Sequence, residues 1–294
     1  MKFQQEFEDY LIKEKDASGS TLNAYLGDVR DFSNYLDEKR RKDLLSCGSA
    51  DVAAYIMQMK EDGRSASTIN RKMSSIRSYY NFLLGRKAIS INPAQNIKSP
   101  RIVDKGIEYL SIEEVERILD APSLEDAKSK RDKALLELMY ATGMRATEIS
   151  MANVDDLDLK IGFISCTTEG KTRIVPIGRI AKAALESYLA GPREELLRGD
   201  ENSRALFVNF QGQRISRQGI WKIIKFYGEK AGIDKPLSPQ ILRNSFAVHM
   251  VQNGADIRTI QDLLGLEDIN AAKLYALAGK NRVIDVYDRT HPRA

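Results

Sequence analysis

The stretch that decides the fold is Tyr140–Glu148 (YATGMRATE), in the middle of the chain. Gly143 is suited to end the helix before it, because glycine readily adopts the left-handed conformation that follows many helices. Arg145 comes two residues later, so we expect its guanidinium to project from the start of the next helix. Glu148 lies three residues further on, a spacing that allows it to orient Arg145. The stretch therefore predicts a charged site at the junction of two helices.

Length and composition set the broad class. The chain has 294 residues, 43% hydrophobic and 29% charged, enough for two ordinary domains with a core each. No apolar run approaches the roughly eighteen residues of a membrane span, and Met1–Glu6 lacks the apolar part of a secretory signal. We expect a soluble, cytoplasmic protein with no membrane partner. Cys47 and Cys166 are isolated from other Cys or His, which predicts reduced, buried thiols and neither metal nor cofactor.

The first hundred residues carry helical patterns. Apolar residues at three- and four-residue steps predict helices over residues 20–38, 50–59 and 65–84. Ser20 and Thr21 are candidate caps for the first of them. The prolines at positions 93 and 100 then stop the helical pattern. We therefore expect a domain boundary near residue 105, with domains 1–105 and 106–294.

The second half mixes helices with a hairpin. Helices are expected to open at Ser111 and to cover residues 131–140, 147–152, 180–189, 217–231 and 239–252. Residues 163–166 and 173–177 resemble two strands joined by a polar turn around Glu169 and Gly170. Residues 206–208 are a candidate third strand. The pattern predicts a mainly α protein with a small antiparallel β-sheet.

Basic residues concentrate in one region. Residues 60–105 contain ten basic and three acidic side chains, a local net charge of +7 in a chain whose total is +4. The helix expected over residues 65–84 has a polar and basic face, made of Asn70, Arg71, Ser74 and Arg77. Such side chains reach phosphates and base edges, which predicts binding in a DNA groove. An ordinary solvated helix face explains the same pattern.

The chemistry-bearing residues lie in the second half. A tyrosine can cut a phosphodiester if one group stabilises charge on the non-bridging oxygens and another protonates the leaving oxygen. Arginine meets the first need, because its planar guanidinium stays charged and binds phosphate in a bidentate manner. Arg145 and Arg243 are candidates for the charge-stabilising role and Tyr275 for the attacking tyrosine, and Gln240 shares one helical face with Arg243. Taken singly, Arg145 is explained as a surface salt-bridge partner and Tyr275 as a half-buried core residue.

In these motifs the chain resembles the tyrosine recombinase (phage integrase) family, and its Xer branch most closely. The resemblance covers nearly the whole length, and its specificity comes from the order and spacing of the motifs. They are residues 141–148 (ATGMRATE), 173–176 (RIVP), 237–247 (LSPQILRNSFA), 253–256 (NGAD), 263–265 (LLG), Tyr275 and the terminal 291–294 (HPRA).

The resemblance implies a function. Two arginines, here Arg145 and Arg243, would clamp the scissile phosphate, and Tyr275 would attack it to leave a 3′-phosphotyrosyl link. It also implies an N-terminal helical SAM-like core-binding domain that clasps double-stranded DNA, and a C-terminal mixed α/β catalytic domain. Assembly on DNA as a homo- or hetero-oligomer, with a second recombinase as one partner, is implied too. The helix after Tyr275, with Val283, Ile284, Val286 and Tyr287, would then pack on a neighbouring protomer; packing on its own domain fits the sequence equally well.

The chain departs from the family at several catalytic positions. Gln240 stands where the family has a histidine, and Leu266 where it has histidine or tryptophan. The family's hairpin lysine would fall near Thr168 or Glu169. Lys171, the nearest lysine, matches either that catalytic group or, more simply, a second, non-catalytic basic residue. Losing a general acid or base typically costs about a hundred- to ten-thousand-fold in rate, so we expect weak activity or none.

Three functions follow from these observations. The first is a site-specific DNA recombinase that cuts and rejoins strands through Tyr275. The second is a DNA-binding paralogue that occupies a site, or assists an active recombinase, without cutting. The third, a helical regulator with no recombination role, requires Arg145 and Arg243 to lie far apart in the fold.

Overall fold

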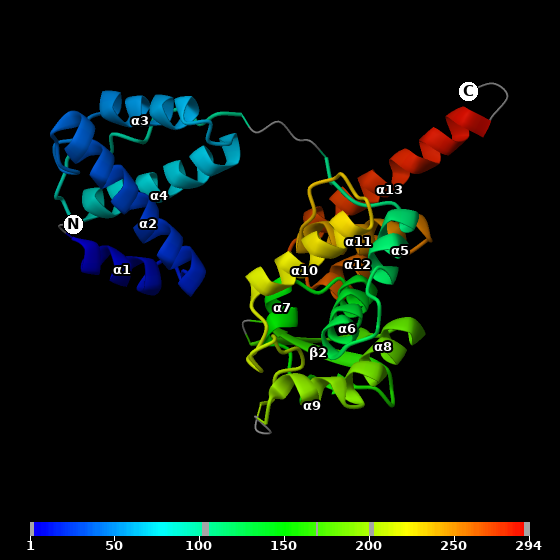
Figure 1. Cartoon of the computed structure of the whole chain (residues 1–294). Coiled ribbons are helices and arrows are strands. Elements are labelled where there is room, and N and C mark those ends of the chain that lie inside the picture. Colours follow the sequence, from blue (N-terminus) through cyan, green and yellow to red (C-terminus); the bar gives the residue numbers. More distant parts are fainter. Residues whose placement is uncertain (1–2, 102–105, 169, 200–202, 291–294) are drawn as a thin grey trace. The chain divides into compact units, whose positions relative to one another are not determined.

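The computed structural model describes the backbone of residues 3–101, 106–168, 170–199 and 203–290, and the side chains of these residues up to 279. The chain divides into two units, Met1–Asp104 and Lys105–Ala294, which are described separately (Figure 1). Helices dominate both units, and a small antiparallel sheet lies in the second, which confirms the predicted fold class. Within the described residues no helix has the length and apolar character needed to cross a membrane.

The first unit is helical throughout its described part. Its elements are α1 (Gln4–Lys13), α2 (Gly19–Tyr35), the π-helical turn η1 (Leu36–Arg40), α3 (Ser49–Glu61) and α4 (Ala66–Gly85). α2 packs along α4, and aromatic rings fill the space between the helices, among them Phe7, Phe32 and Tyr80. The cap of α2 is Ser18, whose side chain accepts from the Thr21 amide, and neither Ser20 nor Thr21 takes that place. The expected cap was wrong because the helix begins one residue before Ser20.

The second unit holds the remaining elements. They are α5 (Ile112–Asp120), α6 (Ala127–Thr142), α7 (Ala146–Met151), the 3₁₀ turn η2 (Val154–Asp156), β1 (Leu157–Asp158), β2 (Phe163–Thr168), β3 (Lys171–Pro176), α8 (Arg179–Leu189), α9 (Pro192–Leu197), α10 (Arg217–Lys230), α11 (Pro239–Gln252), α12 (Ile257–Leu264) and α13 (Ile269–Thr290). The helices predicted at residues 147–152, 217–231 and 239–252 are α7, α10 and α11.

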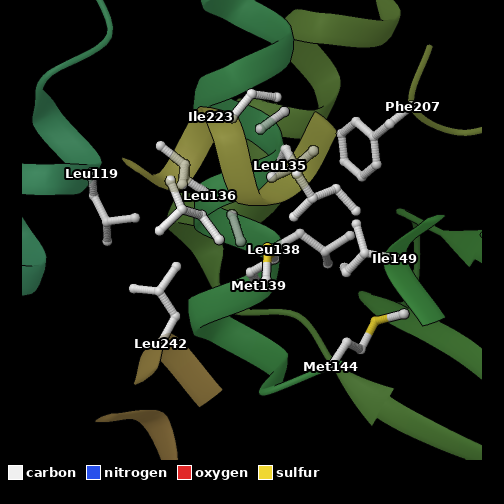
Figure 2. Packing of buried hydrophobic residues seen from close by; sticks show 14 of the residues in the cluster. Leu119, Leu135, Leu136, Leu138, Met139, Met144, Ile149, Phe207, Ile223 and Leu242 are labelled. Atoms are coloured by element: carbon white, nitrogen blue, oxygen red, sulfur yellow. The ribbon is translucent and has the colours of Figure 1, made fainter. Parts of the chain in front are cut away.

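Helix α6 forms the centre of this unit. It is buried on nearly all sides because α5, α8, α9 and α11 pack around it. Leu135, Leu136 and Leu138 point in different directions into the cluster, and Ile223 of α10 and Leu242 of α11 approach from neighbouring helices (Figure 2). Burying one such side chain contributes about 1.5–3 kcal/mol, so this packing holds α6 firmly at the centre of the unit.

The sheet has the order β1-β2-β3, and β2 and β3 form the predicted hairpin. Its inner face carries Ile164, Cys166 and Val175 into the core. The candidate third strand at residues 206–208 is not part of this sheet: Val208 makes only an isolated bridge to Arg214. That apolar run is buried as a loop, which periodicity cannot distinguish from a strand.

The two cysteines differ in burial. Cys166 is buried as expected, whereas Cys47 in the first unit is only half-buried.

Gly143 ends α6 in the left-handed conformation, with φ 61°. A Cβ atom there would lie 2.5 Å from Phe246 Cδ1 and 2.7 Å from Leu264 Cδ2. Only glycine therefore allows the end of α6 to touch both α11 and α12. This close approach brings the start of α7, the middle of α11 and the end of α12 together, and the candidate site lies there.

Candidate active site

Arg145 is the N-cap residue of α7, as the sequence predicts, and Glu148 lies in the first turn of the same helix. The Glu148 carboxylate accepts from the Arg145 amide at 2.6 Å and from the Arg145 guanidinium at 3.2 Å. The predicted orientation of Arg145 by Glu148 is confirmed. A second anchor is the Gly265 carbonyl, 3.4 Å from Arg145 Nη2. The Arg145 guanidinium makes both of these contacts while the side chain remains 39% exposed.

Glu148 also binds Arg173 of β3. The two nitrogens Nη1 and Nη2 of Arg173 donate to the two carboxylate oxygens at 2.6 and 2.9 Å, a bidentate pair. Thr168 of β2 donates to the same carboxylate at 3.1 Å. Burial alone would raise the pKa of Glu148, but the bonds from Arg173 and from the Arg145 amide lower it to about 2. This carboxylate is charged at neutral pH and fixes two guanidinium groups side by side.

A cavity of about 610 Å³ opens beside this pair. We call it the arginine cavity. Its walls are formed by Arg145, Thr168, Lys171, Thr172, Arg173, Gly265, Leu266, Glu267 and Ala271. Three of these side chains are cationic and one, Glu267, is anionic, so the lining is positive overall and suits an anion.

Arg243 lies on α11 and is not among the residues that line the cavity. Its side chain is only 2% exposed, and it donates to the carbonyls of Gly143 at 2.6 Å and Leu264 at 2.7 Å. Burial, and next the positive charge of Arg145, lower the pKa of Arg243 to about 10, so it remains charged at neutral pH. Because Arg145 and Tyr275 both act electrostatically on Arg243, the fold gathers the three residues in one neighbourhood. This contradicts the regulator hypothesis, which required the arginines to lie far apart.

Tyr275 lies on α13, one turn after the cavity residue Ala271. Its ring packs in an apolar cluster with Phe246 and Leu264 and is 6% exposed. Its hydroxyl donates to Asn244 Oδ1 at 3.2 Å, and Tyr275 is not among the residues that line the cavity. The phenol is near the arginines but faces a neutral amide.

The positions that depart from the family pattern are also placed. Gln240 is exposed and donates to Asn244 at 2.8 Å. Lys171 lies at the rim of the cavity, 81% exposed, where its ammonium contacts the Glu267 carboxylate at 3.0 Å. Leu266 lines the cavity with an apolar side chain. No histidine lines the cavity in the described part of the chain.

The two histidines stand elsewhere in the sequence. His249 is buried on α11, with its Nδ1 atom 2.9 Å from the Tyr140 hydroxyl. His291 lies outside the described residues, as do the side chains of the predicted packing residues Val283, Ile284, Val286 and Tyr287.

The four candidate DNA-binding residues of the first unit lie on α4. Asn70 donates to the Pro100 carbonyl at 3.0 Å, and Arg77 donates to the Ile97 carbonyl at 2.6 Å, so these two bind the chain that follows α4. Arg71 pairs with Asp28 yet keeps 48% of its side chain exposed. Ser74 is exposed and donates to a carbonyl of its own helix. DNA contact by this face remains a prediction, and Arg71 and Ser74 are its most accessible members.

Sequence reasoning missed two residues of the site. Arg173 was seen only as part of a strand motif, although it donates to both carboxylate oxygens of Glu148. Asn244 was passed over although it follows Arg243 directly, because no local pattern indicates that its amide meets Tyr275, 31 residues away. The sequence did offer one signal for Arg173: it is a basic residue at a strand position that faces inward.

Two guanidinium groups fixed by one carboxylate, beside a third arginine and a phenol, define a site of the class that receives a phosphodiester. Residues 108–282 match the model of the phage integrase family, and residues 5–87 match the phage integrase N-terminal SAM-like domain. The tyrosine recombinase XerD of Oceanobacillus iheyensis is 40% identical over 295 residues, covering 99% of this chain and 98% of XerD. This chain belongs to the phage integrase family.

Solved structures share the fold. XerH site-specific recombinase in a post-cleavage complex with palindromic difH has a TM-score of 0.77 at 20% identity, over 96% of this chain and 83% of XerH. The lambda integrase tetramer bound to a Holliday junction has a TM-score of 0.73 at 15% identity, over 93% of this chain and 76% of the integrase. At these identities the likeness concerns the fold alone.

Proposed function

We propose that this protein is a site-specific DNA recombinase of the tyrosine type. The observation that carries the proposal is the arginine cavity, whose lining includes Arg145, Arg173 and Lys171, with Arg243 and Tyr275 in the same neighbourhood. Double-stranded DNA is the substrate class, because a phosphodiester offers several oxygens to these fixed donors. The relationship to XerD supports the same function.

In the reaction, the Tyr275 oxygen forms a bond to phosphorus while the bond from phosphorus to the 5′-oxygen breaks. The phenol loses its proton to solvent, and the 5′-oxygen takes one up. The arginines neutralise charge that develops on the non-bridging oxygens. The phosphotyrosyl link retains the energy of the broken bond, so rejoining by a 5′-hydroxyl needs no nucleotide cofactor.

Cleavage by this site is slow. The supporting observation is that Leu266, Thr168 and Gln240 supply neither a base nor an acid that titrates near neutral pH. Losing a group that transfers a proton typically lowers the reaction rate about a hundred- to ten-thousand-fold. We infer that the protein works as an oligomer on DNA, as lambda integrase does in its tetramer, and that a second recombinase is a candidate partner subunit.

A suicide DNA substrate tests the proposal. It carries a nick next to the cleavage point, so that the released fragment diffuses away and the covalent adduct accumulates. We expect a slowly formed protein–DNA adduct that is absent in Tyr275→Phe. Tyr140→Phe is the matched control, because its ring packs on the same cluster while its hydroxyl contacts His249. An adduct that persists in Tyr275→Phe, or none in the natural protein on a tightly bound site, would refute the proposal.

A second function is favoured by one observation. The Tyr275 hydroxyl is bonded to Asn244 outside the cavity, whereas the cavity itself is open. A chain that binds the phosphate but withholds its nucleophile would act as a non-cutting, DNA-binding partner of an active recombinase. Efficient cleavage by the natural protein alone would exclude this alternative.

A further inference from the structure

Residues 107–110, which we call the strap, bind along α11. The Leu110 amide donates to Ser245 Oγ at 2.9 Å, and Asn244 Nδ2 donates to the Glu108 carbonyl at 2.9 Å. Between them, Tyr109 places its ring edge-to-face with His249, with centroids 6.2 Å apart. Two successive side chains of α11 are therefore fastened to the same short segment of backbone.

The strap fixes which way the Asn244 amide points. A backbone carbonyl only accepts hydrogen bonds, so the NH₂ group of Asn244 must face Glu108. Its Oδ1 atom then faces the other side, where the Gln240 amide lies at 2.8 Å and the Tyr275 hydroxyl at 3.2 Å. Because Oδ1 also only accepts, Tyr275 is required to be the donor.

This arrangement has a chemical consequence for Tyr275. The hydroxyl gives its proton to a hydrogen bond with a neutral amide, which is a poor base and cannot take the proton away. Attack on phosphorus requires the phenol to leave this bond, lose its proton and turn toward the arginine cavity. The bond to Asn244 therefore holds the phenol in a position from which it does not attack.

We propose that Asn244 is a positioning residue that holds the Tyr275 hydroxyl in a resting position, and that the strap sets the orientation of Asn244. The proposal deepens the function proposed above and rests on it only where Tyr275 is taken as the nucleophile. Its first prediction concerns the free protein and needs no cleavage.

The hydrogen bond is tested by ¹⁹F NMR of the full chain carrying 3-fluorotyrosine. The chain has twelve tyrosines, and the Tyr275 signal is assigned by its loss in Tyr275→Phe. We expect Asn244→Ala and Asn244→Leu both to shift this signal. Leu keeps most of the side-chain volume without polar atoms, so agreement between the two variants separates the hydrogen bond from packing. Asn253→Ala is the matched control, since Asn253 donates to the His249 carbonyl at the end of the same helix.

The role of the strap is tested by Ser245→Ala. This change removes the acceptor of the Leu110 amide and touches neither Asn244 nor Tyr275. We expect the Tyr275 signal to move in the same direction as in Asn244→Ala, by a smaller amount. A Tyr275 signal that stays in place in Ser245→Ala, in protein whose circular dichroism shows it folded, would refute the part played by the strap.

The consequence for chemistry is measured with the suicide substrate at saturating DNA. We expect Asn244→Ala to form adduct about two- to tenfold faster than the natural protein, the effect of one neutral hydrogen bond. An equal or slower rate would overturn the resting-position role. An unshifted Tyr275 signal in both Asn244 variants would overturn the hydrogen bond itself. If the signal shifts but no variant ever forms adduct, the recombinase function fails while the assignment of Asn244 to Tyr275 stands.

Discussion

The site has an open half, Arg145 and Arg173 beside the arginine cavity, and an enclosed half, Arg243 and Tyr275. The two halves differ in the groups to which their side chains are bonded. In the open half, Arg145 and Arg173 share one buried carboxylate and line a cavity. In the enclosed half, Arg243 and Tyr275 are buried and bonded to carbonyl and amide oxygens of the protein. The half proposed to bind phosphate is held in place by Glu148, whereas the half proposed to react is bonded to other groups of the protein.

This difference separates binding from cutting. Arg145 and Arg173 line the arginine cavity, whereas Arg243 and Tyr275 are not among its lining residues. For the phenol to reach a phosphate in the cavity, its bond to Asn244 must break. Binding and cleavage should therefore respond to different substitutions.

The largest effect is expected for Glu148→Gln, which removes the negative charge shared by Arg145 and Arg173. Removing one partner of a buried, hydrogen-bonded ion pair costs about 3–5 kcal/mol, and Arg173 would lose its counter-charge. We expect the free energy of unfolding at pH 7, measured with urea, to fall by about 4 kcal/mol. DNA affinity should fall as well, because Arg145 and Arg173 lose their common anchor.

The difference in stability between the natural protein and Glu148→Gln should also depend on pH. The folded pKa of Glu148, about 2, lies below its ordinary value of 4.5, so its stabilisation is present above pH 4.5 and disappears as the pH falls toward 2. This contribution is about 3 kcal/mol. The difference between natural protein and Glu148→Gln should shrink over that range. Glu186→Gln, in an exposed pair with Lys182, should change stability by less than about 1 kcal/mol at any pH. A pH-independent difference would contradict the assigned role.

The next largest effect is expected when the site receives the histidines that the family has and this chain lacks. In the double variant Gln240→His and Leu266→His, one imidazole lies on α11 near Asn244 and the other lines the cavity. We expect adduct formation on the suicide substrate to rise about tenfold or more, a part of what general acid–base catalysis supplies. The gain must vanish when Tyr275→Phe is added. An unchanged rate would mean that access to Tyr275, and not proton transfer, limits the reaction.

The elements of the fold were largely predictable because their signals are local. The glycine at 143, the strand pattern of the hairpin and the apolar spacing of α10 and α11 each act within about a dozen residues. Arg145 with Glu148 was predictable for the same reason, since both lie within one turn. The residues 206–208 were mistaken for a candidate strand because a buried loop and a buried strand have the same apolar composition.

The missed contacts depend on distance along the chain. Arg173 meets Glu148 across 25 residues, and Glu108 meets Asn244 across 136. Such pairs arise only when packing has placed whole helices, so no spacing rule anticipates them. Gln240 is a different case: its amide contacts Asn244, four residues on in the same helix, a spacing that is local, although the sequence directed attention to Arg243.

The smallest effect is expected at the rim of the open half, where Lys171 and Glu267 are 81% and 82% exposed. Lys171→Gln should weaken DNA binding about two- to fivefold and reduce the slope of log affinity against log salt by about one, because one phosphate contact is lost. Glu267→Gln should have the opposite sign, since it removes a carboxylate from the entrance and releases Lys171 toward phosphate. Fluorescence anisotropy over a salt series measures both effects.

The double variant Lys171→Gln, Glu267→Gln shows how the Glu267 carboxylate affects DNA binding. If Glu267 opposes binding only by occupying Lys171, replacing it in the Lys171→Gln background changes nothing. If it repels the phosphates directly, binding still tightens. Equal effects of Lys171→Gln on affinity at low and high salt would show that Lys171 contacts no phosphate, and the open half would then consist of Arg145 and Arg173 alone.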